Sequence, residues 1–453
     1  MQQLNSNYPS SIRGWYMVGI LFVAFLFSII DRQILGLFLV PIQQSLGVSD
    51  THMGLLHGFT FAIFFAVMGL PIARLIDSGN RRLIICIGIF VWSAATVACG
   101  FATEFWHLVV TRIFIGAGEA TLVPGTVSLI ADSFEPHDRG KAMGVFSAGA
   151  TTGAGISMLS GAVLVGFLST LTFSSPLFAS MEPWQLVFIM VGLPGILVSL
   201  FVMTTKEPGR RNEKLRAPLA DVCGYLKDNG NTYLLLFAAA CFLGIAFRAH
   251  LAWTPSLLIR RFDVTTSEAG LIFGSVLILF APAGAVAGGY VADRMLKHGI
   301  QAARIWVAVI STAGLACFGM LYSLSDSLTM LVVWLAPCIF FVSLSIPCLF
   351  SAIQDIVPGA MRGQITALYS GIENLVGYGV GPLMVALLTD KYFQNPAMIH
   401  FSLAIVIVCF AVLGVVTFIW GIKPYRRSFS LEKEGNWVRE GKASEGAGES
   451  LPA

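Results

Sequence analysis

Twelve long apolar stretches constrain the fold of this chain more than any other feature of its sequence. A helix that crosses a bilayer needs about 20 mostly apolar residues. Of the 453 residues, 56% are hydrophobic and only 12% are charged, a balance that excludes an ordinary soluble domain. We therefore predict an all-α membrane protein whose twelve transmembrane helices cover roughly 14–40, 53–76, 82–102, 105–131, 140–168, 184–204, 232–258, 267–292, 303–323, 328–354, 363–388 and 398–422.

Lysine and arginine residues predict how these helices are oriented. If the N-terminus lies inside, the inner segments carry many cations, whereas the outer segments hold only Arg260, Arg261 and Lys391. Because cytoplasmic loops are enriched in Lys and Arg, we expect a multi-pass protein of the cell inner membrane with both termini in the cytoplasm. The net charge of +3 reflects this bias and gives no reason to expect nucleic-acid binding.

The two halves of the chain repeat each other. Several residues recur at an offset of 216 positions and, further along, of 223, at similar places relative to the spans. Two parallel halves are typical of transporters whose bundles rock around a site at the middle of the membrane. The matched pairs include Arg32 with Arg248, Gly54 with Gly270, Gly58 with Gly274, Asp77 with Asp293, Asp132 with Asp355, and Arg139 with Arg362.

The longest interior polar segment, 205–231, separates the two sets of six spans. It is basic and contains two prolines, so we predict a cytoplasmic linker with one amphipathic turn near Leu219–Leu226. The N-terminal six-helix bundle then covers 1–204, and the C-terminal bundle covers 232–422. The tail 423–453 is polar and rich in Gly and Glu, which predicts a disordered cytoplasmic segment.

Arg32 and Arg248 lie deep in the first span of each half. A charge in hydrocarbon costs at least about 2.5–3.5 kcal/mol, so it usually faces a cavity or a partner. A guanidinium group suits a phosphate or a carboxylate, and the two cations therefore suggest an anionic substrate between the bundles. Alternatively Arg248 pairs with Glu373 in span 11; that pair would break during transport, so Glu373 is also a substrate-binding candidate. His57, which can titrate near neutral pH, is a further candidate, with packing as its alternative role.

Asp31, Arg112 and Glu119 form a candidate proton-coupling group. Asp31 lies about 25 Å from the inner end of its span and Arg112 about 10 Å from the outer end of span 4, so an ion pair is possible. Glu119 follows Arg112 by seven residues, on the same helical face. A carboxylate beside an arginine can be ionised and paired or protonated and free, as a proton carrier requires. A permanent ion pair that fixes spans 1 and 4 is the alternative.

Both halves repeat a charged motif in the inner loop after their second span. It reads ARLIDSGNRR in the first half and GGYVADRMLK in the second. The aspartate can pair with a helix end of the same half, and the arginines can bridge to neighbouring helices, which would lock an outward-open state. The candidate gating residues are Asp77, Arg81, Arg82, Asp293 and Arg294, together with the duplicated Arg139 and Arg362.

Other functional classes lack their motifs in this sequence. It contains no phosphate-binding loop and no spacing of His, Cys and Asp typical of a metal site. Of the eight cysteines, seven lie within the predicted spans, where they serve as small packing residues. We therefore expect no enzyme activity and no metal or cofactor. We expect a monomer among membrane lipids, driven by a proton gradient.

These motifs resemble the major facilitator superfamily over nearly the whole chain. Asp77–Arg82 and Gly289–Arg294 are similar to its loops between spans 2 and 3 and spans 8 and 9, and Arg112–Gly116 is similar to its span 4 motif. The Asp31-Arg32 pair, TRIFIGAGEA, LIADSF and LAWTPSLL resemble the spinster-type branch. This resemblance implies twelve helices in two pseudo-symmetric bundles and proton-linked movement of lysophospholipids or sphingosine-phosphate-like amphiphiles. It also implies proton coupling by Asp31 and Glu119, with Arg112 as their partner.

The first hypothesis is therefore a proton-coupled secondary transporter of an anionic amphiphile that works by alternating access. Arg248 and Glu373 do not map onto the spinster-type pattern, so a transporter of a small soluble organic anion, or a multidrug-type exporter, is the alternative. A channel or a non-transporting sensor is a third class. Gating motifs that are duplicated in both halves favour alternating access, which needs them, over a pore, which does not.

Overall fold

The computed structural model describes residues 11–170, 180–210, 218–359 and 361–433, and within these ranges it contains helices and no strand. Twelve helical segments there are long and apolar enough to cross a membrane, as the sequence predicted. The elements are α1 Ser11–Leu37, α2 Leu39–Leu46, α3 Asp50–Gly54, η1 Leu55–Thr60, α4 Phe61–Ser78, α5 Arg81–Cys99, α6 Phe105–Glu119, α7 Leu122–Ser133, α8 Pro136–Leu168, α10 Pro183–Met203, α11 Leu219–Asp228, α12 Gly230–Phe262, α13 Thr266–Lys297, α14 Ala303–Ser323, α15 Leu328–Ile356, α16 Arg362–Leu387, η2 Leu388–Phe393, η3 Pro396–Met398 and α17 Ile399–Lys433.

Two spans of the first half are interrupted, the second near its start and the fourth near its middle. The second span runs from α3 through η1, a π-helical turn, into α4. The fourth span joins α6 to α7 across a short turn at Ala120–Thr121, just before Pro124. Such interruptions change the direction in which neighbouring side chains point, and π-helical turns are frequent at functional sites.

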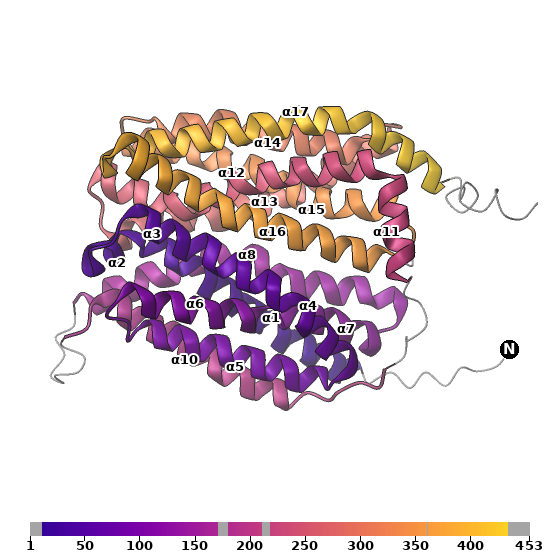
Figure 1. Ribbon diagram of the computed structural model, residues 1–453, viewed down its shortest axis with the longest axis horizontal. Helices are drawn as coiled ribbons and strands as arrows, with labels where there is room; N and C mark the ends of the chain where they lie inside the picture. The colour runs from indigo at the N-terminus through magenta and orange to yellow at the C-terminus, as the bar shows by residue number, and fades with distance from the viewer. Residues whose placement is uncertain (1–10, 171–179, 211–217, 360, 434–453) are drawn as a thin grey trace, which may run out of the picture.

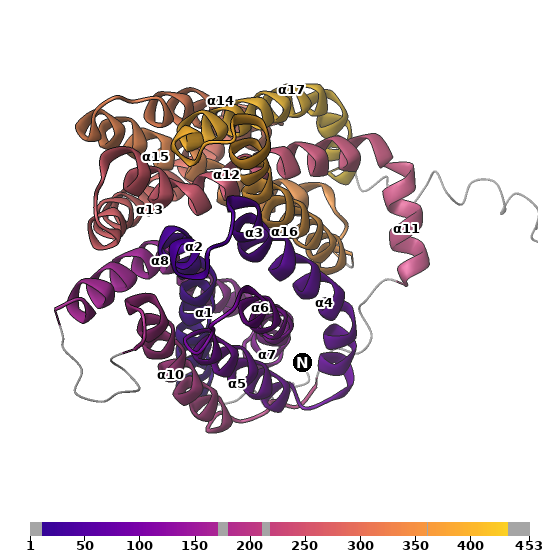
Figure 2. The same ribbon diagram turned by 60° about the vertical axis from the view of Figure 1, so that its left-hand side comes forward.

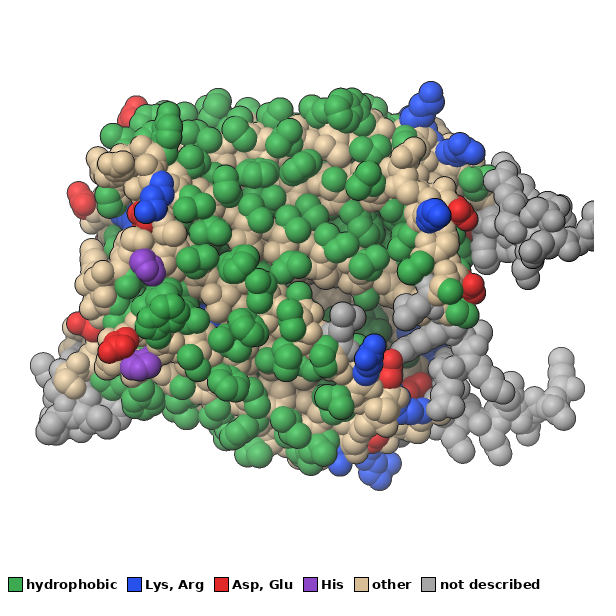
Figure 3. Space-filling view, in the orientation of Figure 1, with side chains coloured by type: hydrophobic (Ala, Val, Ile, Leu, Met, Phe, Trp, Pro, Cys, Tyr) green, Lys and Arg blue, Asp and Glu red, His purple; other side chains and the backbone are tan. Residues whose placement is uncertain are grey.

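The helices form two groups (Figure 1). α1 to α10 make the lower group, which we call the N-terminal bundle, and α12 to α17 make the upper group, the C-terminal bundle. On the face shown in Figure 3, apolar side chains cover the middle, while charged and histidine side chains gather towards the left and right ends. A wide apolar band between two polar ends is what a bilayer requires, so the chain is a multi-pass membrane protein.

The last helix is longer than predicted. We predicted a disordered tail from residue 423, but α17 continues to Lys433. Ile422, Tyr425 and Phe429 are all buried along one face of this helix, and the Tyr425 hydroxyl donates to the carbonyl of Ala352 at 3.2 Å. The apolar face therefore extends past the predicted span, and the prediction is wrong for 423–433. Residues 434–453 lie outside the described ranges.

The two bundles pack together at the end that holds α2 and α3, which we call the closed end. Figure 2 brings this end forward and shows α3 beside α16. Glycines allow the close approach: a Cβ atom on Gly58 would lie 2.1 Å from the carbonyl oxygen of Tyr378, and one on Gly274 would lie 2.9 Å from Leu159. Any larger residue at these places would push the bundles apart.

The opposite end, which holds the linker and α11, is called the linker end. Its ion pairs stay within one bundle or join a bundle to the linker. Between residues that the structure describes, no hydrogen bond or ion pair connects the two bundles at this end. The arginine ion pairs found there are Arg81 with Asp132 and Glu207, Arg304 with Asp355, and Arg362 with Glu432.

Candidate binding and proton-coupling site

Arg32 of α1 forms an ion pair with Glu119, the last residue of α6. Its Nε atom also donates to Glu119 Oε2 at 3.1 Å. The side chains are 12% and 0% exposed, and the guanidinium lies 4.6 Å from the centre of the Phe61 ring. The buried cation of the first half therefore points into the protein, where an acid and an aromatic ring stabilise it.

Asp31 and Arg112 lie beside this pair but are not joined as we predicted. Nη1 of Arg112 donates to the backbone carbonyl of Asp31 at 3.4 Å, and Glu119 pairs with Arg32 instead of Arg112. Arg112 and Glu119 both lie within α6, so the seven-residue spacing holds, and the physical reason is the position of α1, which brings Arg32 to Glu119. Oδ1 of Asp31, Oε1 of Glu119 and Nη2 of Arg112 are buried without a hydrogen-bond partner.

Arg248 of α12 occupies the matching place in the second half. Its Nη2 atom lies 3.4 Å from Glu373 Oε1 and 3.3 Å from Asn374 Oδ1, both on α16. The ion pair that the sequence offered as an alternative is therefore present. The two charged side chains are 15% and 18% exposed, so this pair is less shielded than the one in the N-terminal bundle.

Tyr378 of α16, which the sequence analysis did not single out, contacts both arginines. The centre of its ring is 4.2 Å from the Arg248 guanidinium carbon and 5.4 Å from that of Arg32. The duplicated cations therefore converge on one aromatic ring at the bundle interface. A tyrosine between two glycines in an apolar span carries no charge signal, so only the helix pairing reveals its position.

His57 lies in the π-helical turn η1 and is buried. Its Nδ1 atom has no hydrogen-bond partner, and its Cε1 atom would be 3.6 Å from a Cβ atom placed on Gly36 of α1. Among the described residues, no hydrogen bond connects His57 to Arg32 or Arg248. It therefore lines the packed interface near the site and is not part of the ion-paired group.

The predicted gating residues of the first half are bound within the N-terminal bundle and the linker. Arg81 pairs with Asp132 and, at 2.7 Å, with Glu207. Arg82 donates to the carbonyl of Thr205 at 2.8 Å. The carbonyl of Asp77 accepts a hydrogen bond from Arg210 of the linker.

The second half has a similar arrangement, but a different arginine forms the corresponding ion pair. Arg304, which the sequence analysis did not single out, pairs with Asp355 at 2.7 Å, as Arg81 does with Asp132. Asp293 and Arg294 are exposed, and Arg294 lies 3.4 Å from the Tyr290 hydroxyl. The remaining duplicated pair shares one geometry, since Nε of Arg139 donates to the Phe134 carbonyl at 3.0 Å and Nε of Arg362 to the Val357 carbonyl at 2.9 Å.

A second group of charges joins the bundles at the closed end. Arg260 of α12 donates to Asp50 of α3 at 2.8 Å and to Gln43 of α2 at 2.6 Å. The Asp50 side chain is 0% exposed. The Thr51 hydroxyl donates to Asp390 at 2.7 Å. These contacts escaped the sequence analysis because they connect loop-side residues that are far apart in the chain.

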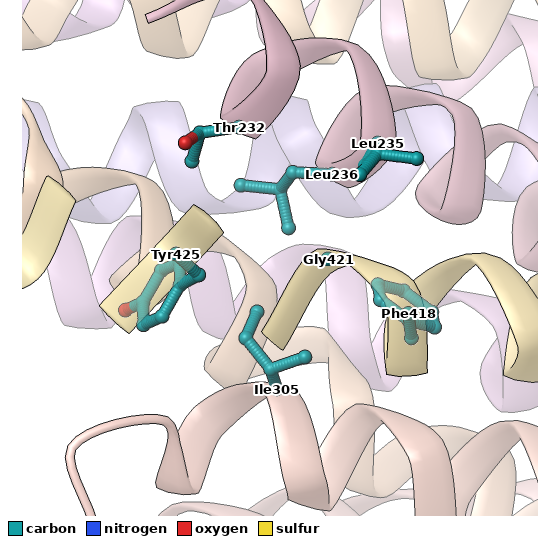
Figure 4. Close-up of a pocket in the computed structure, with 7 residues that line it drawn as sticks. All are labelled: Thr232, Leu235, Leu236, Ile305, Phe418, Gly421 and Tyr425. Carbon is teal, nitrogen blue, oxygen red and sulfur yellow. The ribbon is translucent and has the colours of Figure 1, made fainter. Parts of the chain in front are cut away.

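A small cavity in the C-terminal bundle does not belong to this site. It has a volume of about 10 Å³ and lies among residues of α12, α14 and α17. Figure 4 shows Leu236, Ile305 and Tyr425 around it. A space of this size holds about one water molecule, and its walls are almost entirely apolar, so it offers no binding chemistry.

Comparison with known proteins supports the family that the sequence motifs predicted. A family model described as Major Facilitator Superfamily matches residues 21–382. Among solved structures, a bacterial homolog of the human lysosomal transporter Spinster, in an inward-facing and unoccupied conformation, aligns with a TM-score of 0.77 at 25% identity over 95% of this chain and 100% of that chain.

Two relatives known as transporters differ in the substrates that their names give. The sphingosine-1-phosphate transporter SPNS2 of Danio rerio is 26% identical over 84% of this chain and 77% of its own length. The probable L-galactonate transporter of Escherichia coli is 25% identical over 89% of this chain and 88% of its own length. The family and these relatives identify a transporter and not an enzyme, and they leave two substrate classes open.

Proposed function

The chain belongs to the major facilitator superfamily, and we propose that it is a proton-coupled transporter of an anionic amphiphile, a lysophospholipid or a sphingosine-phosphate-like lipid. The observation that carries the proposal is the convergence of Arg32 and Arg248. One cation comes from each bundle, each is paired with a carboxylate, and both contact Tyr378. An anion held by both would link the two bundles through charge-assisted hydrogen bonds.

Glu119 is the proposed proton carrier. While it is ionised it occupies Arg32, so the guanidinium is not free for a substrate. When a proton binds Glu119, the ion pair breaks and Arg32 can bind the anionic group of the substrate. Coupling of this kind is reciprocal, so the bound anion would also favour protonation of Glu119.

Asp31 and Arg112 are proposed to support this exchange. A buried carboxyl oxygen without a hydrogen-bond partner is costly as an anion and much less so in a neutral acid, which suits Asp31 as a second protonation site. Arg112, which holds the backbone of Asp31, has a free buried donor that can receive a carboxylate when Arg32 leaves Glu119. Alternation between these partners would transmit the proton to the substrate arginine.

The distribution of cations supports an inner-membrane protein with both termini in the cytoplasm. In that orientation the closed end faces outward and the linker end faces the cytoplasm, so the structure corresponds to an inward-facing state. The duplicated residues at the linker end, including Asp77, Arg81, Asp293 and Arg362, would then gate the cytoplasmic side when the bundles close there. The protein is proposed to act as a monomer, since each chain contains both halves of the site.

A small soluble organic anion is the second candidate substrate. The galactonate relative supports it, and so does Asn374, whose amide beside Arg248 could hydrogen-bond a substrate hydroxyl. The same two cations would bind a carboxylate, so the ion pairs alone do not distinguish the two classes.

Reconstitution into proteoliposomes tests both candidates. Uptake of labelled lysophosphatidic acid and of labelled D-galactonate would each be measured with an imposed pH gradient and with the other compound as competitor. We expect uptake of the lysolipid, weak competition by galactonate, and loss of the pH dependence in Glu119→Gln. Glu268→Gln, at an exposed helix start, is the matched control and should keep the dependence. Uptake of galactonate alone would support the second candidate, and uptake of neither would contradict the proposal.

A further inference from the structure

The ring of Tyr378 is held by contacts from both bundles. It lies on α16 of the C-terminal bundle and is 3% exposed. Nε2 of Gln33, on α1, is 3.4 Å from its hydroxyl, and the Phe61 ring meets it edge to face at 5.9 Å between centroids. Its backbone is fixed as well, because its carbonyl oxygen fills the space that a side chain on Gly58 would need.

The same ring lies close to both arginines. A guanidinium within about 6 Å of a ring centroid is attracted by the electrons of the ring face, and both Arg32 and Arg248 meet this condition. The ring therefore provides part of the negative environment that a bound anion would otherwise supply. It does so without the negative charge of an anion.

One donor and one acceptor of the site have no hydrogen-bond partner. Nε of Arg248 and Oε1 of Glu119 are both buried and have no hydrogen-bond partner. Buried donors and acceptors without partners are rare and indicate a missing ligand, water or proton. An anion with two or more oxygens could accept from Arg248 Nε and from Arg32, whereas the face of a tyrosine ring cannot satisfy these donors in the same geometry.

We propose that Tyr378 takes the place of the substrate's anionic group while no substrate is bound, holding both arginines until that group displaces the ring. This inference rests on the proposed function and adds a positioning residue to it. Charge-assisted bonds to a phosphate or a carboxylate are stronger than contacts with a ring face, so an anion wins this exchange and an uncharged ligand does not. Because Tyr378 also contacts α1, η1 and α4 of the other bundle, its displacement removes one of the links between the bundles.

The test is direct binding to the purified full-length protein. The probes are lysophosphatidic acid with monoolein as its uncharged counterpart, and D-galactonate with D-galactose. Tyr378→Leu removes the ring but keeps an apolar side chain. We expect it to bind whichever anion the wild type binds about two- to thirty-fold more tightly, the range of one cation–π contact, with no gain for the uncharged counterpart. Its turnover in proteoliposomes should fall, because the ring can no longer return to release the anion.

Two further tests, one variant and one series of variants, separate this role from simple packing. Tyr425→Leu removes another buried ring of the C-terminal bundle, which packs on Phe429 of α17, and it should leave anion affinity unchanged. A series with fluorinated phenylalanines at position 378 keeps the ring size and weakens its attraction for cations stepwise. Anion affinity should rise along that series, which keeps the proposal testable even if Tyr378→Leu does not fold.

Unchanged or weaker anion binding by a folded Tyr378→Leu protein, together with no trend in the fluorinated series, would overturn this inference. The proposed function would be unaffected in that case, because the wild type would still bind and transport the anion. If the wild type binds neither anion, the proposed function fails first, and the two failures are distinguishable.

Discussion

The closed end and the linker end of the bundle interface differ in where their charges find partners. At the closed end Arg260 crosses from one bundle to Asp50 and Gln43 of the other, and Thr51 bonds to Asp390. At the linker end the arginines pair with acids of their own bundle or of the linker. Hydrogen bonds and ion pairs therefore cross the interface at the closed end, whereas among the described residues none crosses it at the linker end.

Glycines along the helices of the interface also differ between the two ends. Towards the closed end, a Cβ atom on Gly58 or Gly274 would collide with the facing bundle. Towards the linker end, a Cβ atom on Gly69, Gly144 or Gly289 would meet nothing within 4 Å. Small residues permit helices to pack closely and slide, so the open glycines are placed for the packing that a closed linker end would need.

Arg260→Ala is the substitution expected to reduce the difference between the two ends most. Asp50 would then be a buried carboxylate without its partner, which costs about 3–5 kcal/mol and acts against the closed end. Spin labels at Gln44 and Tyr392, both exposed, in a background without the eight native cysteines, should show a longer distance than in the parent.

Arg304→Ala is the matched control for that measurement. It breaks an ion pair of the linker end within one bundle, so it should reduce the unfolding temperature without lengthening the distance between the labels. An equal effect of both substitutions on the label distance would mean that the two ends do not differ as described.

Gly58→Ala is expected to have the next largest effect. The added methyl group would lie 2.1 Å from the Tyr378 carbonyl, and such overpacking typically costs about 1–3 kcal/mol. Gly144→Ala adds the same group where it meets nothing, and it should be neutral or stabilise the helix by about 0.5–1 kcal/mol. Thermal unfolding in detergent measures both, and a Gly58→Ala protein as stable as the Gly144→Ala protein would contradict the close contact.

Substitution of Arg210 tests the contacts of the linker end. Its guanidinium donates to the carbonyls of Ile76 at 2.7 Å and Gly79 at 2.6 Å, where α4 ends and its carbonyls lack helical partners. Because Arg210 is exposed, Arg210→Ala should lower stability by only about 1 kcal/mol. The label distance at the closed end should stay as in the parent. Lys206→Ala, exposed on the same segment, should change neither quantity.

Tyr225→Phe is the smallest change that we predict to be measurable. The hydroxyl of Tyr225 on α11 donates to the carbonyl of Ile356 at 2.5 Å, which ties the linker helix to the end of α15. Burial raises the pKa of this phenol, so it stays protonated and able to donate throughout the neutral range. Its loss should cost about 0.5–1.5 kcal/mol, seen in thermal unfolding equally at pH 6 and pH 8. A loss that appears at only one pH would contradict this assignment.

Local apolar composition and length made the twelve spans predictable, and residues that recur at fixed offsets made the duplication predictable. The need of Arg32 and Arg248 for a partner or a cavity was also predictable, because a charge in an apolar span is costly. The partner of Glu119 was not, since the position of α1 relative to α6 is a tertiary property.

Contacts across the bundle interface were the least predictable part of the site. Tyr378 looks like a packing residue until α16 is placed against α1 and η1. Arg260 and Asp50 stand at the ends of spans in different halves, where many charged residues are merely solvated. The extension of α17 to Lys433 was missed because charged residues between Tyr425 and Phe429 mask an apolar face that continues at helical spacing.

Proton uptake on anion binding tests the central claim most directly. Calorimetric titration of the purified protein with the bound anion, in two buffers of different ionisation enthalpy, counts the protons taken up. Protonation of Glu119 as Arg32 changes partner predicts that the wild type takes up about one proton per anion bound, as linkage requires, and that Glu119→Gln takes up nearly none. The same proton uptake in both proteins, or none in the wild type, would contradict an anion site coupled to protons through the Arg32–Glu119 pair.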